Sequence, residues 1–332
     1  MRPDFKVVAD TQDVTAVIRS RLVSLEIVDE AGVQSDSAEI VLSDHGEHVA
    51  LPRRGATLEI SMGYAGRAMV ALGTYVVDEV EISGSPPTLT VRSRAANLRE
   101  TAKSQHTRAW EGTTLGAILS AIAKEEGWRA QVHPTVSALP IVRADQANES
   151  NLHFMTRLGE QHGCIAKVAQ GTLVVVPAGG GESGSGKPLG ATIITPERCA
   201  PGWRVTLADR GKYKRVVASW HDPSTGRRVG ETAGEGDPAY TLNETFSDAT
   251  SARRAAESRL AALERGKGTV SLEIVPGEPG LCAAGVIELR GFREGADGRW
   301  SCKRVCHKVT GGGGCSTAVE AESLQTDGSV AP

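Results

Sequence analysis

Alternation of apolar and polar residues constrains this chain more than any other feature. Leu58, Ile60 and Met62 face one way, while Glu59 and Ser61 face the other. Runs like this one, bounded by Gly, Pro, Asp and Ser, recur from residue 5 to residue 95 and are typical of half-buried β-strands. About six such runs predict a closed barrel or sandwich with one wet face over residues 1–100.

The periodicity changes in the segment 101–177. Two amphipathic helices are predicted, one between a threonine cap and Gly127, the other from Ser150 or Asn151 to Gly163. A hairpin around residues 165–176 follows. We therefore predict a small α/β domain here. The apolar stripes of the two helices are Leu115, Ile118, Leu119, Ile122 and Ala123, and then Leu152, Met155 and Leu158.

Strand patterns return after a glycine-rich stretch. Residues 178–190 read AGGGESGSGKPLG, a composition typical of a flexible linker or exposed loop. Residues 191–323 are predicted to form a second strand-rich domain with one helix at 248–265, capped by Ser247 or Asp248 and ended by Gly266. Residues 324–332 are predicted to be a flexible tail. The expected fold class is mainly β with an α+β insert.

Composition and charge argue against several partners. The net charge is -3 and the pI about 6.3, which does not favour nucleic acid or an anionic membrane as a binding partner. No apolar stretch approaches the roughly 20 residues that span a bilayer, and the N-terminus lacks the apolar core of a signal peptide. We expect a protein without a membrane anchor that is made and folded in a cytosol.

The six cysteines are too sparse for a disulfide scaffold and are expected to be reduced, buried thiols. They are Cys164, Cys199, Cys282, Cys302, Cys306 and Cys315. Three of them lie near His307 and raise the possibility of a zinc site. The C-x₃-C-H spacing is not a usual zinc spacing, and in an extended strand Cys302 and Cys306 would share a face while His307 points away. Packing thiols are the preferred interpretation.

Residues 181–188 fit the phosphate-binding pattern GxxxxGK[ST] except at its last position. Pro188 stands where the Mg²⁺-binding hydroxyl belongs, and a proline also removes a backbone N–H from the phosphate cradle. No helix is predicted to begin there. The stretch is therefore interpreted as a linker.

Two further segments contain histidines that could belong to a site. His45 and His48 could bind a metal but are interpreted as a solvated turn, and His221–Asp222 lacks a nucleophile in a glycine-flanked elbow. The carboxylates are scattered and cannot be paired for acid–base catalysis from the sequence. We predict no catalytic residue, no cofactor and no metal site, and a chain that is not an enzyme.

The stretch from Trp110 to Ile118 resembles the opening of a LysM module, a fold that binds peptidoglycan sugars. The second half of that module is not recognisable in residues 132–145. A peptidoglycan-binding or cell-wall-degrading tail component using this insert is the alternative function.

Several short motifs follow one another in a fixed order: VRSRA (91–95), WEGTTLGAI (110–118), NESNLHFMTRL (148–158), AAESRL (255–260), GKG (266–268), GF (291–292), WSCKRVCH (300–307) and TAVE (317–320), with Gly171, Leu173, Pro177, Gly280, Val286 and Gly314 between them. Together they resemble the phage late-control D family, which forms the hub of phage tails and matches the N-terminal hub portion of VgrG spike proteins. The resemblance covers residues 90–320. Two local departures are Cys306, beside the family's histidine position, and the glycine-rich turn 311–314.

The resemblance implies a fold and an assembly. Two tail-tube-like β-barrel domains would flank the α/β insert, and three chains would close into a homotrimeric ring. Such a ring would adapt the hexameric tail tube to the trimeric central spike, with a central channel for the tape measure protein and for DNA in transit. Further partners would be other baseplate proteins. The protein would be found in the virion baseplate after assembly in the host bacterial cytoplasm.

Overall fold

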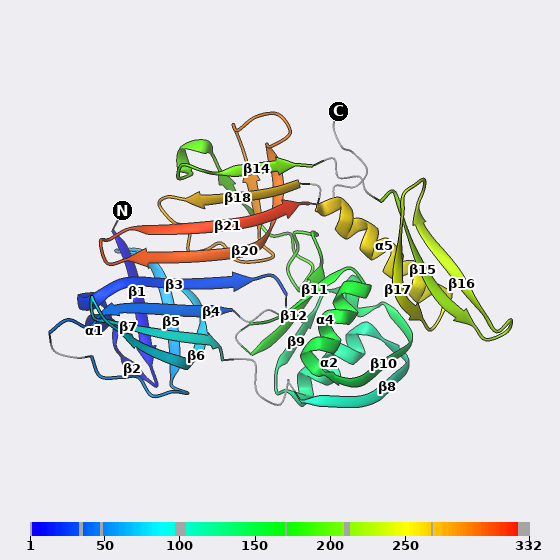
Figure 1. Ribbon diagram of the computed structural model, residues 1–332, viewed down its shortest axis with the longest axis horizontal. Coiled ribbons are helices and arrows are strands. Elements are labelled where there is room, and N and C mark those ends of the chain that lie inside the picture. Colours follow the sequence, from blue (N-terminus) through cyan, green and yellow to red (C-terminus); the bar gives the residue numbers. More distant parts are fainter. Residues whose placement is uncertain are drawn as a thin grey trace.

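The computed structural model describes residues 2–32, 36–46, 49–96, 104–169, 171–208, 213–266 and 268–324. Most of the described residues lie in strands, which confirms the mainly β fold class. Figure 1 shows a ladder of neighbouring strands, from β14 at the top to β6 below, with the α/β insert to its lower right and α5 beyond it. No sheet of the described residues closes on itself.

The described residues from 2 to 96, referred to as the first or N-terminal half, contain seven strands and one short helix. In chain order these are β1 (Pro3–Ala9), β2 (Gln12–Asp13), α1 (Thr15–Arg21), β3 (Leu22–Glu30), β4 (Ser37–Ser43), β5 (Thr57–Tyr64), β6 (Val70–Ser83) and β7 (Thr88–Ala95). Their spatial order is β3-β4-β7-β6-β5-β1-β2. Alternate residues of these strands point inward and form one apolar core, as the sequence pattern predicted.

The strands between residues 191 and 323, leaving out β15 to β17 (residues 215–246), form the C-terminal half and extend the same sheet. The strands of this half are β13 (Ala191–Ile194), β14 (Arg204–Leu207), β18 (Gly268–Ile274), β19 (Val286–Leu289), β20 (Gly298–Thr310) and β21 (Cys315–Ser323). β20 pairs with β3 in antiparallel register, with His307 opposite Ile27. The two halves therefore share one 13-stranded sheet, while a second apolar core lies under β18, β20 and β21.

The insert between the halves has its own sheets and core. Its elements are β8 (Gln105–Thr114), α2 (Leu115–Glu125), β9 (Arg129–Val132), α3 (Pro134–Ser137), β10 (Pro140–Ser150), α4 (Asn151–Gln161), β11 (Cys164–Ala169) and β12 (Thr172–Pro177). The two predicted helices are confirmed as α2 and α4, capped by the side chains of Thr114 and Ser150. The long antiparallel pair of β8 and β10 was not predicted from the sequence.

A further three-stranded sheet lies beside the insert. It contains β15 (Arg215–Asp222), β16 (Arg227–Gly234) and β17 (Ala239–Phe246) and packs on α5 (Ala249–Arg265), capped by Asp248. The helix agrees with the prediction. The three strands were expected to belong with the rest of residues 191–323, but they pair among themselves because α5 covers their apolar face.

One other local expectation differs from the structure, and a second, a loop or linker at 178–190, is found as a loop. The segment 15–21 was expected to continue a series of strands but forms α1, a seven-residue helix that buries only Ile18 and has no side-chain cap. A helix so short leaves no clear periodicity in the sequence. The glycine-rich stretch 178–190 is a folded loop, closed by backbone bonds between Ser183 and Lys187 and between Leu189 and Gly181.

The glycine-rich turn after β20 has a steric explanation at Gly311. Its N–H donates to the carbonyl of Val23 at 3.0 Å, and an added Cβ would lie 1.8 Å from the carbonyl oxygen of Leu22. Only glycine allows the β20–β21 hairpin to approach the start of β3 this closely.

We predict that Gly311→Ala destabilises the chain by about 1–3 kcal/mol, because the methyl group forces β20 and β3 apart. Gly312→Ala is the matched control, since nothing lies within 4 Å of its Cβ position. Urea unfolding of both variants measures the difference. Equal stability of the two variants would contradict the steric explanation.

Candidate functional site

The two halves and the insert meet at a cavity of about 410 Å³. β3 and β6 of the first half, β11 and β12 of the insert, the loop 182–189 and the segment 279–284 all contribute to its wall. The wall is mostly apolar, but it also carries Asp29, Asp36, Lys167 and His307. These four side chains give an otherwise apolar wall charge and hydrogen-bonding capacity.

Lys167 of β11 binds the first half of the chain at this cavity. Its ammonium group forms an ion pair with Asp29, donates to the carbonyl of Glu30 at 2.9 Å and lies 3.1 Å from Asp36 Oδ1. Asp29 in turn accepts a hydrogen bond from the N–H of Ala283 at 2.8 Å. One lysine and one aspartate therefore join all three parts of the molecule.

Burial and charge together shift the pKa values of this cluster. Burial raises the pKa of Asp36 to about 6 from its ordinary 3.8, against the attraction of Lys167 and with the help of the negative charge on Asp29. Burial alone would lower the pKa of Lys167, but the charges of Asp29 and Asp36 outweigh it and raise that pKa. Lys167 is therefore an ammonium ion in the folded protein over the physiological range.

His307 lies in the wall of the same cavity and is fixed by two hydrogen bonds. Nδ1 lies 3.0 Å from the hydroxyl of Thr317 and Nε2 lies 3.0 Å from the carbonyl of Leu281. The carbonyl can only accept, so Nε2 carries the proton and Nδ1 accepts from Thr317. Burial lowers the pKa of His307. The imidazole is a neutral structural link between β20, β21 and the loop before β19.

The prediction that Cys302 and Cys306 share a face of their strand is wrong. The register between β20 and β21 shifts between Cys302 and Arg304, which places an extra residue in β20. Because of this β-bulge, Cys302 is buried on the same face of the strand as Val305 and His307. Cys306 lies half-buried on the opposite face. Among the described residues, no group of three His, Cys, Asp or Glu side chains could hold a metal ion.

The expectation of buried cysteines holds for three of the six. Cys164, Cys302 and Cys315 are buried, Cys199 and Cys306 are half-buried, and Cys282 is exposed. All six are free thiols. Cys282 lies in the irregular segment before β19 and lines the cavity.

The remaining sequence candidates lie apart from one another. Residues 181–188 form the loop described above, which leads to β13 and not to a helix. His45 is exposed, and its partner His48 lies outside the described residues. Asp222 accepts bonds from Ser224 and Thr225 in the turn after β15, so its carboxylate closes that turn beside the exposed His221.

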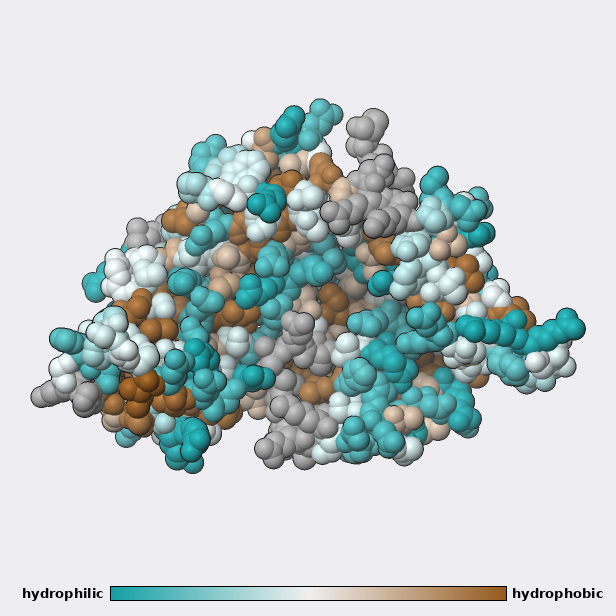
Figure 2. All heavy atoms as spheres, viewed as in Figure 1, coloured by the Kyte–Doolittle hydropathy of each residue, from teal (hydrophilic) through white to brown (hydrophobic). Residues whose placement is uncertain are grey.

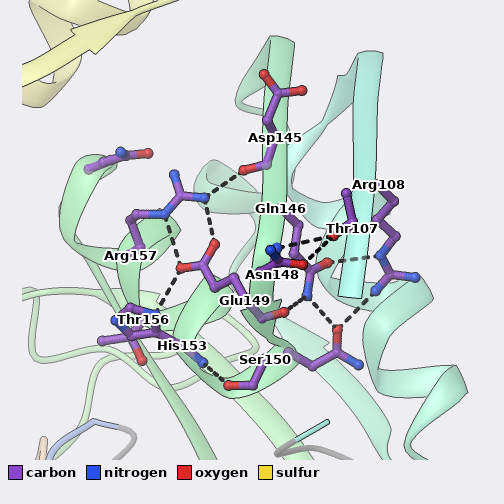
Figure 3. Close-up of polar contacts among 12 residues, drawn as sticks. Thr107, Arg108, Asp145, Gln146, Asn148, Glu149, Ser150, His153, Thr156 and Arg157 are labelled. Atoms are coloured by element: carbon purple, nitrogen blue, oxygen red, sulfur yellow. Dashed lines mark hydrogen bonds and ion pairs between the residues drawn. The ribbon is translucent and has the colours of Figure 1, made fainter. Parts of the chain in front are cut away.

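The motif from Asn148 to Leu158 builds the join between β10 and α4 (Figure 3). Glu149 receives two hydrogen bonds from Arg157, at 3.1 and 2.8 Å, and the same guanidinium donates to the carbonyl of Asp145 at 2.8 Å. Ser150 caps the helix by accepting from the N–H of His153. The motif therefore holds the helix against the strand and leaves no reactive group free.

A second chain of polar side chains connects this motif to β8 and α2. Buried Gln146 accepts from Arg108 at 2.8 Å and donates to Asn151 at 3.0 Å, and Asn151 donates to Glu126 at 2.8 Å. Arg108 also stacks on the ring of Trp110, 4.7 Å from its centroid. Fully bonded networks of this kind fix one arrangement of neighbouring elements.

Comparison with known proteins assigns the chain to a family. The family model described as "Phage tail baseplate hub (GPD)" matches residues 38–313. The chain belongs to the phage tail baseplate hub family. A protein of Escherichia phage P2 named "Probable baseplate hub protein" is 31% identical, over 98% of this chain and 95% of its own length. Its counterpart in Escherichia phage 186 is 30% identical. The resemblance noted in the sequence is thereby confirmed.

Solved structures share the fold of this hub family. A tail protein from Neisseria meningitidis MC58 has a TM-score of 0.71 at 11% identity, over 97% of both chains. A prophage tail protein from Shewanella oneidensis has a TM-score of 0.70 at 12% identity, over 96% of this chain and 97% of its own. A type VI secretion component of E. coli has a TM-score of 0.59 at 10% identity, over 92% and 74%. No helix of the described residues is long and apolar enough to span a membrane.

The junction was not predicted from the sequence. Lys167 was included in a predicted strand, and Asp29 and Asp36 drew no attention because they lie far from it along the chain. A lysine in the middle of the apolar run CIAKVA is the one available signal. Its partners could not be identified without the tertiary structure.

Replacing Lys167 by methionine should destabilise the protein by about 3–5 kcal/mol, because Asp29 and Asp36 would remain buried without their cation. Lys187→Met is the control, since Lys187 is exposed and its loss should change stability by less than about 0.5 kcal/mol. Thermal or urea unfolding measures both. A small loss for Lys167→Met would contradict the role given to the ion pair.

Asp36 should make stability depend on pH between its unfolded pKa of 3.8 and its folded pKa of about 6. Because the folded pKa is the higher one, the contribution is complete below 3.8 and is lost as the pH rises to about 6. Asp36→Asn removes this titratable carboxyl. The free energy of unfolding of wild type should therefore fall relative to that of the variant as the pH rises from 3.8 to about 6. Asp222→Asn is the control: it keeps Asp36, and the pKa of Asp222 is lowered, so wild type should not lose stability relative to this variant over the same range. Urea unfolding at a series of pH values measures both differences.

Proposed function

We propose that three copies of this chain form a ring that adapts the hexameric tail tube to the trimeric central spike. One observation carries the proposal: a continuous run of eight strands crosses both halves of the chain, in the order β14-β18-β21-β20-β3-β4-β7-β6. The first four belong to the C-terminal half and the last four to the N-terminal half. Two similar four-strand units per chain, copied three times, would present six units to a hexameric tube.

The open face of these eight strands suits the wall of a central channel. Cross-strand register places charged and small polar side chains on this face, while the opposite face forms the two apolar cores. Figure 2 shows hydrophilic residues interspersed with hydrophobic ones over the sheet in this view. The carboxylates of the face are Glu26, Glu30, Glu39, Asp78, Glu79, Glu81, Glu273, Glu320 and Glu322, and its cations are Arg92, Arg94, Arg204, Lys303, Arg304 and Lys308.

An acidic excess on this face would help DNA to pass. A basic wall would hold DNA by releasing its counterions, whereas an acidic wall repels the phosphates and leaves the strand mobile. Arg92 shows the excess locally, because three carboxylates, Glu39, Glu79 and Glu81, surround this single guanidinium. The tape measure protein would occupy the same channel before DNA does.

The remaining parts of the proposal follow from this ring. Residues 1–100 and 191–323 would be the two tube-like barrel domains, 101–177 the insert domain, 178–190 the connecting loop and 324–332 a tail. The partners would be the spike, the tube, the tape measure protein and other baseplate proteins. The chain would act in the virion baseplate as a structural protein without catalysis, after assembly in the host cytoplasm.

Peptidoglycan binding by the insert is the second candidate. It would need an exposed aromatic surface for sugar stacking, and the aromatic residue of the LysM-like stretch is Trp110. Arg108 occupies one face of that ring, and the indole N–H is buried. These contacts favour the ring over the glycan-binding alternative.

The mass of the purified full chain in solution tests the proposal. We expect a threefold species, alone or after addition of the neighbouring spike protein, by native mass spectrometry. A pull-down on purified peptidoglycan is run in parallel, and the chain should stay in the supernatant. A chain that remains monomeric with the spike present would refute the ring, and retention on peptidoglycan would favour the alternative.

A further inference from the structure

The cavity at the junction has an apolar wall built from alternate residues of the surrounding strands (Figure 1). In β11, Ile165, Lys167 and Ala169 line the cavity, and the residues between them belong to the core of the insert. The volume of about 410 Å³ lies within the range of about 300–1,000 Å³ that is usual for small-molecule pockets. The cavity is partly open to solvent. Other apolar side chains of the wall are Ile27, Leu72, Tyr75, Val174, Val176 and Leu189.

The charged part of the wall is acidic. Among the described residues that line the cavity, the carboxylates are Asp29, Asp36 and Glu182, and the ammonium group is that of Lys167. Three negative charges and one positive charge leave an excess of two negative charges. Glu182 also lies 2.9 Å from Nε2 of His133, so an excess of one charge remains even when that imidazole is protonated.

This excess is unfavourable, because carboxylates removed from water need compensating charge. Burial and the charge of Asp29 raise the pKa of Asp36, although Lys167 attracts that carboxylate. His307, whose pKa is lowered by burial, adds no positive charge to the wall. A second cation beside these carboxylates would favour their ionised form. An occupant with a positive charge at one end and an apolar body would therefore match both parts of the wall.

We propose that this cavity binds a small aliphatic amine, with its ammonium group beside Asp29 and Asp36 and its hydrocarbon chain along the apolar wall. The ligand adds a second cation to the cluster and leaves Lys167 in its place. An alcohol of the same length would lack the charge, and a carboxylate would carry the wrong sign. This site goes beyond the proposed ring and does not depend on it.

A metal ion fits the cavity less well than an amine does. Among the residues that the structure describes, no group of three His, Cys, Asp or Glu side chains is arranged to hold one. A bare ion would also leave the apolar wall uncovered, whereas a hydrocarbon chain gains free energy when it is removed from water. The combination of acidic and apolar lining therefore favours an organic cation.

Isothermal titration calorimetry of the full chain tests the site. The probes are hexylamine, hexanol and hexanoate, which share one hydrocarbon chain and differ in the charge of the head group. At about pH 8 Asp36 is ionised, because its pKa is about 6. We expect hexylamine to bind about tenfold more tightly than hexanol, or better, and hexanoate to show no binding.

Three variants locate the bound amine. Asp36→Asn removes one negative charge and should weaken hexylamine binding by about tenfold, with hexanol unchanged. Ala169→Leu fills part of the cavity and keeps every charge, so it should weaken the binding of both hexylamine and hexanol. Asp222→Asn is the matched control, since this carboxyl lies in the turn after β15, and it should bind hexylamine like wild type. Circular dichroism confirms the fold of each variant.

The outcomes decide the proposal without reference to the ring. If hexylamine does not bind, or binds no more tightly than hexanol, the charge argument is wrong. Binding that Asp36→Asn leaves unchanged, or that Asp222→Asn weakens equally, places the amine elsewhere and overturns the site. If Asp36→Asn does not fold, Ala169→Leu decides, because undiminished binding of hexylamine by that variant would also overturn the site.

Discussion

A single buried ammonium group holds the three parts of this molecule in register. Lys167 reaches from the insert into the first half of the chain, where it meets Asp29 and Asp36, and Asp29 also binds the backbone of the C-terminal half at Ala283. The desolvation cost of such a cluster is high, so its ion pairs must all be present together. The interaction therefore specifies one relative placement of the parts more than it adds stability.

The continuous sheet depends on the same region. β3 carries Asp29 near its end and pairs with β20 along its length, so the ion cluster sits where the two halves merge. Gly311 allows the hairpin after β20 to approach β3, and the hydroxyl of Tyr64 donates to the carbonyl of Gly277 at 2.6 Å across the two halves. A rigid wall that spans both halves follows from these contacts. Such rigidity would suit the channel wall that we propose for this sheet.

The family motif around Glu149 has an architectural role that its sequence does not reveal. Polar and charged residues in a fixed spacing suggest a reactive site, yet each one here is occupied by a cap, an ion pair or a backbone carbonyl. The same holds for His307, whose two ring nitrogens are both bonded. In this chain, these residues of the family motifs keep strands and helices in place.

The sequence by itself determined the mainly β class, the helices α2, α4 and α5 with their caps, and the family, because these depend on local periodicity and motif order. Only the tertiary structure decided the merger of β20 with β3, the separate sheet of β15–β17 and the position of Cys306, which one β-bulge moved to the other face of its strand. Lys167 and Asp29 are 138 residues apart. Partners so far apart along the chain leave no pattern in a single sequence. Folding brings them together, and burial then strengthens their attraction.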